Sequence, residues 1–135
     1  MVQDYLYRAR RCLEEAALAF EKEDLAGTVR RSQEALELAV KAVLRSVGVE
    51  YPREHDVGGA LTAVDEKLPR ELRTRVAELR ALLTEPARVR GPAFYGYERE
   101  GVPPRKAFSR DYAQETLSQV TDLVGACLRA VGQVM

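Results

Sequence analysis

The stretch from Leu25 to Gly48, LAGTVRRSQEALELAVKAVLRSVG, carries apolar residues that recur at steps of three, four and seven. That spacing places them on one broad face of an α-helix, so the stretch predicts a helix buried against other helices. Asp24 stands where an N-cap is expected. Gly48 suits a left-handed C-terminal cap, and Tyr51-Pro52 forbids continuation of the helix.

The rest of the chain follows the same helical pattern. We predict helices over 3–21, from Asp56 to about Glu66, from Pro69 to Pro86, and from near Ser109 almost to the end. The short polar link 21–24 makes the first two helices antiparallel. The sequence therefore predicts one domain over 1–135, an all-α antiparallel bundle of about five helices with a long irregular loop before the last helix.

Charge and composition exclude several classes of protein. Lys plus Arg and Asp plus Glu each number 21, so no overall field attracts nucleic acid, and no apolar run is long enough to span a membrane. We expect a cytoplasmic protein. Cys12 and Cys127 lie on apolar helix faces, so we expect free thiols. Glycine-rich phosphate loops, Cys-x-x-Cys pairs and metal-spaced histidines are absent from the sequence, so no cofactor or metal ion is expected.

The loop from Pro86 to Phe108, PARVRGPAFYGYEREGVPPRKAF, is the first candidate for a functional site. Five basic residues against Glu98 and Glu100 leave it a net charge of plus three. Arginine forks can hold phosphate, and bases can stack on aromatic rings. The alternative is that the aromatic side chains fix the loop to the bundle while the arginines are solvated.

A row of polar residues borders the apolar face of the central helix. Gln33, Glu37 and Lys41 follow at steps of four, which favours a partly buried network over a surface ion pair. We assign these three and Asp56, the expected cap of the third helix, to a structural polar network. His55, the single histidine, is either a general base or, more often in such a turn, a residue that orders the backbone.

The outward face of the fourth predicted helix has mixed charge. It carries Arg73, Arg75 and Arg80 among Glu71 and Glu78. We predict a solvated surface there.

Three stretches together resemble the HEPN domain, a small all-α domain of prokaryotes often encoded beside a minimal nucleotidyltransferase. SQEALELAVKAVLRSVG (32–48) is similar to the family's Q-x-x-x-E-x-x-x-K helix ending in glycine, and YPREHDV (51–57) is similar to its P-x-x-H-D-[LV] turn. The third is VPPRKAFSRDYAQETL (102–117), which leads into the last helix. The resemblance implies a helical bundle that dimerises and, in many members, a metal-independent ribonuclease acting as a toxin.

In those members an arginine, four to six residues and a histidine form the active site near a dimer interface. Alignment from Arg88 with a four-residue gap puts Ala93 at the histidine position and Tyr95 two residues further on. Counting from Arg90 instead, the histidine position falls between Tyr95 and Tyr97, and tyrosine is a poor base at neutral pH. Arg88 and Tyr95 are therefore the candidate catalytic residues, and the resemblance leaves open whether the chain is an enzyme.

Two functions follow from these patterns. The first is a homodimeric, non-catalytic or weakly catalytic module that recognises a nucleotide, RNA or a nucleotidyltransferase partner. Its candidate ligand-binding residues are Arg88, Arg90, Tyr95, Tyr97 and His55. The alternative is a metal-independent ribonuclease toxin of a HEPN/nucleotidyltransferase toxin–antitoxin pair that uses a displaced base.

Overall fold

The computed structural model describes residues 1–49, 57–84, 101, 103 and 107–134. Within these residues the secondary structure is helical and contains no strand, which confirms the predicted all-α class. The helices are α1 (Val2–Glu21), α2 (Leu25–Ser46), α3 (Val57–Ala63), the 3₁₀ turn η1 (Asp65–Lys67), α4 (Arg70–Arg73), α5 (Val76–Thr84) and α7 (Arg110–Val134).

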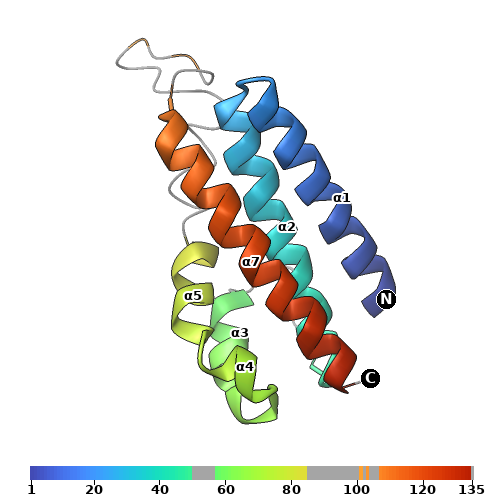
Figure 1. The fold of residues 1–135 in the computed structure, drawn as a ribbon. Coiled ribbons are helices and arrows are strands. Elements are labelled where there is room, and N and C mark those ends of the chain that lie inside the picture. The colour runs from blue at the N-terminus through green and yellow to red at the C-terminus, as the bar shows by residue number, and fades with distance from the viewer. Residues whose placement is uncertain (50–56, 85–100, 102, 104–106, 135) are drawn as a thin grey trace.

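Three long helices form the body of the bundle (Figure 1). α1 and α2 make an antiparallel hairpin, and α7 packs on α2 while running in the same direction as α2. The short helices α3, α4 and α5 gather beside the C-terminal halves of α2 and α7. α2 is thus the helix that the others surround.

The turn between α1 and α2 is fixed by its cap. Asp24 accepts a hydrogen bond on Oδ1 from the backbone N–H of Gly27 at 3.0 Å, as the sequence predicted. The hydroxyl of Thr28 donates to the backbone carbonyl of Asp24 at 2.8 Å. At the other end of α2, Gly48 has a φ of +80°, so the predicted left-handed glycine is also confirmed.

The core is built around α2, in which 14 of 22 residues are buried. The opposing surfaces come from α1, α3, α5 and α7. The largest fully buried side chains on these helices and on α4 include Leu36, Leu44, Leu61, Leu72, Leu79 and Leu123. A smaller cluster, in which Ala26 and Val29 meet Phe108 and Ala113, closes the end of the bundle where α7 begins.

The prediction of a single helix from Pro69 to Pro86 is wrong in one respect, because the helix is interrupted between α4 and α5. The backbone N–H of Arg75 bonds to the carbonyl of Leu72, three residues back, at 2.9 Å. The hydroxyl of Thr74 donates a hydrogen bond to the backbone carbonyl of Glu71 at 3.0 Å. A threonine hydroxyl that competes for a helix carbonyl in this way favours interruption of the helix. The third helix also stops earlier than predicted, at Ala63, before the turn η1.

Both cysteines are free and buried, as predicted. Burial raises the pKa of the Cys127 thiol to about 12, and burial with the nearby Glu34 and Glu15 carboxylates raises that of Cys12 to about 11. A thiol in such surroundings is unreactive. In the described part of the chain, no helix is both long and apolar enough to cross a membrane.

Candidate functional site: the helix ends that border the arginine and tyrosine segment

The candidate ligand-binding residues Arg88, Arg90, Tyr95 and Tyr97 lie outside the described residues, and so do His55 and Asp56. The structure shows the two helices that border the segment 85–106, namely α5 before it and α7 after it. These two helices fix where the chain leaves the bundle before the segment and where it rejoins the bundle after it.

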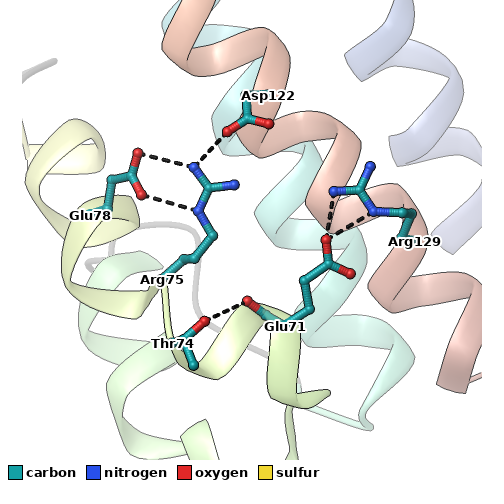
Figure 2. A network of polar contacts seen from close by, with 6 residues as sticks. All are labelled: Glu71, Thr74, Arg75, Glu78, Asp122 and Arg129. Carbon is teal, nitrogen blue, oxygen red and sulfur yellow. Dashed lines mark hydrogen bonds and ion pairs between the residues drawn. The ribbon is translucent and has the colours of Figure 1, made fainter.

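α5 is tied to α7 by the guanidinium of Arg75 (Figure 2). Its Nε and Nη2 donate to the two carboxylate oxygens of Glu78 at 3.1 and 3.2 Å, and Nη2 also donates to Asp122 at 2.7 Å. The two hydrogen-bonded carboxylates raise the pKa of Arg75 further above its ordinary value, so its charge is permanent. The side chain of Arg75 is only 24% exposed.

A second bridge ties α4 to α7. Arg129 donates from Nε and Nη2 to the same oxygen of Glu71, at 2.9 and 2.6 Å. The hydrogen bond from Arg129 lowers the pKa of the Glu71 carboxyl. The predicted mixed-charge surface is therefore solvent-exposed at Glu78, while Glu71 and Arg75 are partly exposed and also form bridges to α7, which the sequence analysis did not predict.

The other border of the segment is anchored by aromatic packing. Phe108 is buried, and its ring stacks on that of Tyr112 with centroids 5.6 Å apart. The guanidinium of Arg110 lies over the ring of Phe20, 4.4 Å from its centroid, and pairs with Glu23 at 3.8 Å. The start of α7 is thus fixed to the α1–α2 turn.

A groove of about 300 Å³ lies between α5 and α7, next to both borders. Its lining residues are Glu78, Ala81, Leu82, Tyr112, Glu115, Thr116 and Gln119. The carboxylates in this groove can accept hydrogen bonds from a polar group bound there, and the amide can both donate and accept them. Among the described residues, no cluster of three or more His, Cys, Asp or Glu side chains could hold a metal ion. Sequence reasoning missed this groove because only the fold brings α5 against α7.

The polar row on α2 is divided in the structure. Lys41 Nζ pairs with Glu37 Oε1 at 3.1 Å, and the two side chains are 23% and 34% exposed. Gln33 is buried, and its Nε2 has no hydrogen-bond partner within the described part of the chain. The structure therefore brings Glu37 and Lys41 together, and it shows no hydrogen bond from Gln33 Nε2 to either of them.

The protein is an all-α helical bundle, and a basic, tyrosine-bearing segment precedes its last helix. A family model described as the HEPN domain matches residues 2–130, which is nearly the whole chain. The chain belongs to the HEPN domain family. The match includes all three stretches on which the resemblance rested. Comparisons with curated proteins and with solved structures give no match.

Proposed function

We propose that this protein is a single-domain, homodimeric HEPN module that binds a nucleotide, RNA or a nucleotidyltransferase partner and has little or no ribonuclease activity. The proposed binding residues are Arg88, Arg90, Tyr95, Tyr97 and His55. One observation carries the proposal: the segment 86–108 holds five basic residues and no histidine.

The chemistry of the segment suits binding better than cleavage. Guanidinium groups form paired hydrogen bonds with phosphate oxygens, and tyrosine rings stack on bases. Cleavage of RNA without metal needs a group that removes the proton from a ribose 2′-hydroxyl. The position that would hold the family's histidine is Ala93 when counted from Arg88. Loss of a general base lowers the rate by roughly 10² to 10⁴.

The helices that border the segment are themselves fixed in the bundle, and this supports binding. Arg75 holds α5 to Asp122 of α7, and Phe108 is buried at the other end. A segment attached at both ends to fixed helices loses less conformational entropy on binding than a free tail does. This favours recognition of one ligand over loose attraction of any polyanion.

Fluorescence anisotropy tests the proposal with the full-length protein, EDTA and a labelled single-stranded RNA of mixed sequence, with AMP and ATP as competitors. We expect the double variant Arg88→Ala/Arg90→Ala to bind RNA at least tenfold more weakly. Arg73→Ala, which removes an exposed arginine on α4, is the matched control and should bind normally. Equal affinities for the two variants would refute the assignment.

The ribonuclease toxin is the second candidate, because Arg88 and Tyr95 are both present. The same RNA, incubated with EDTA and run on a denaturing gel, distinguishes it. If the RNA is cleaved, and if Arg88→Ala abolishes this cleavage while Arg73→Ala preserves it, the protein is a ribonuclease and the binding-module hypothesis is wrong. A nucleotidyltransferase partner would be supported if incubation with ATP and a minimal nucleotidyltransferase attached a nucleotide mass to Tyr95, with release of pyrophosphate.

A further inference from the structure

The groove between α5 and α7 has no part in the proposed function. Its volume of about 300 Å³ is at the lower end of the range for small-molecule sites in proteins. Ala81, Leu82 and the ring of Tyr112 give the groove apolar surface, while its other four lining residues have polar side chains. Among the described residues that line it, Glu78 and Glu115 are acidic and none is basic.

The charges around the groove do not balance. Arg75 is hydrogen-bonded to the carboxylates of Glu78 and Asp122, which together carry one negative charge more than Arg75 neutralises (Figure 2). Glu115 adds a second negative charge, and in the described part of the chain its carboxylate accepts only a long hydrogen bond of 3.5 Å from the amide of Gln119. Two uncompensated negative charges therefore lie beside the groove in a protein whose formal net charge is zero.

The other basic residues of α5 and α7 do not supply the missing positive charge. Arg129 is paired with Glu71 of α4, and Arg110 packs on α1 at the far end of the bundle. Arg80 follows Glu78 by two residues, and side chains at that spacing point to different sides of a helix. An occupant that complements the charge of the groove is therefore a cation.

A buried hydroxyl group also lines the groove. Thr116 is only 3% exposed, and its hydroxyl forms no hydrogen bond with any residue that the structure describes. Thr28 and Thr121, by contrast, each donate a hydrogen bond to the backbone carbonyl four residues earlier. A buried hydroxyl without a partner costs free energy, and a ligand that donates a hydrogen bond to it removes that cost. Independently of the acidic charges, Thr116 thus places a hydrogen-bond acceptor one residue after Glu115.

We propose that the groove between α5 and α7 binds a linear aliphatic polyamine, of the class that spermidine represents. One ammonium group donates hydrogen bonds to the Glu115 carboxylate and the Thr116 hydroxyl, and another lies against the Glu78 carboxylate. Both oxygens of Glu78 already accept hydrogen bonds from Arg75, but each carboxylate oxygen has two acceptor positions. The methylene groups between the ammonium groups pack on Leu82.

The chemistry of the groove favours a polyamine over other cations. A metal ion needs several oxygen ligands that converge on one point, and the described residues offer no such cluster. The volume of the groove suits a small molecule rather than a folded partner. Glu78 and Glu115 belong to different helices, and both helices also contribute apolar surface. A polyamine carries positive charge at more than one point along an apolar chain, so it complements both features.

Isothermal titration calorimetry of the full chain with spermidine at low salt tests the proposal. We expect a single site per chain, with weaker binding in high salt because the exposed charges are screened. Glu115→Gln removes a charge with little change of shape, and Thr116→Val removes the hydroxyl with little change of volume. Each variant should bind spermidine roughly fivefold more weakly. The second variant separates a built site from diffuse attraction of a polycation, which a neutral change does not affect.

Glu66→Gln, which removes an exposed acid in η1, is the matched control and should bind spermidine normally. Circular dichroism establishes that each variant is folded, and the exposed position of Glu115 keeps the test available if Thr116→Val does not fold. Magnesium chloride at an equal concentration of positive charge should displace spermidine poorly, because Mg²⁺ has no apolar part.

The proposal fails if several millimolar spermidine gives no saturable heat with the original chain. It also fails if either folded groove variant binds as Glu66→Gln does, or if magnesium displaces spermidine as well as unlabelled polyamine does. The inference does not rest on the proposed function, because the residues that line the groove lie outside 86–108. RNA binding is measured without polyamine, so failure of either hypothesis is seen separately.

Discussion

Replacement of Arg75 and Asp122, singly and together, measures how strongly α5 is tied to α7. The relevant variants are Arg75→Met, which keeps the aliphatic stem, Asp122→Asn, and the double variant. Arg75 Nη2 lies 2.7 Å from Asp122 Oδ2, and the two residues are 47 positions apart in the sequence. The double-mutant cycle isolates this contact from the local pair with Glu78.

The exposed fractions of the two side chains set the magnitude. Exposed ion pairs contribute roughly 0.2 to 1 kcal/mol to the free energy of unfolding. Asp122 is 60% exposed, which limits the gain, whereas Arg75 is 24% exposed and loses less of its attraction to solvent screening. We therefore expect a coupling energy near the upper end, about 1 kcal/mol. In a chain of this length that corresponds to about 4 °C in the melting temperature.

Urea unfolding followed by circular dichroism provides the four free energies, in low salt and in 1 M NaCl. A matched cycle uses Arg110→Met and Glu23→Gln, whose side chains are 56% and 80% exposed and 3.8 Å apart. We expect that pair to couple by only a few tenths of a kcal/mol. If the Arg75–Asp122 coupling is no larger than this control, the partly shielded guanidinium does not hold α5 in place and the reasoning is wrong.

Three further predictions test the cap, the second bridge and the thiols. Asp24→Ala should lower the free energy of unfolding by about 1 kcal/mol in urea titration. Gly27→Ala should stabilise the protein only in the Asp24→Ala background, because a Cβ at Gly27 meets the Asp24 side chain. If the changes in the free energy of unfolding of the two single variants simply add up in the double variant, this prediction is wrong. Arg129 lowers the pKa of the Glu71 carboxyl. The bridge therefore contributes to the free energy of unfolding above the ordinary carboxyl pKa, and this contribution is lost as pH falls through the lowered pKa. The urea midpoints of the original protein and Arg129→Gln should therefore converge in acid, and a gap constant with pH would disprove the bridge. Cys127 should resist iodoacetamide at pH 8 until urea is added, and rapid native alkylation would show that it is accessible.

The long helices could be predicted because their evidence is local. Apolar spacing found α1, α2 and α7, and side-chain chemistry placed the cap at Asp24 and the left-handed residue at Gly48. Each of these features depends on residues within a few positions of one another. The family resemblance could be recognised for the same reason, since its stretches are short and continuous.

The break at Thr74 could not be read from spacing. Leu72 and Val76 keep a helical step of four across it, so the period shows no interruption. The bridges from Arg75 and Glu71 to α7 join residues 47 and 58 positions apart, and the groove between α5 and α7 depends on the same tertiary packing. The roles of Arg88, Arg90 and Tyr95 stay predictions, because these residues lie outside the described residues.

The order of the helices along the chain also matters while the protein is being made. The hairpin of α1 and α2 depends on neighbouring residues and can form early. The side chains that complete its apolar surroundings, among them Leu123, Val124 and Cys127, belong to α7. A nascent chain thus presents the uncovered side of α2 until α7 has left the ribosome. Chains shortened before Arg110 should consequently aggregate or be retained by chaperones.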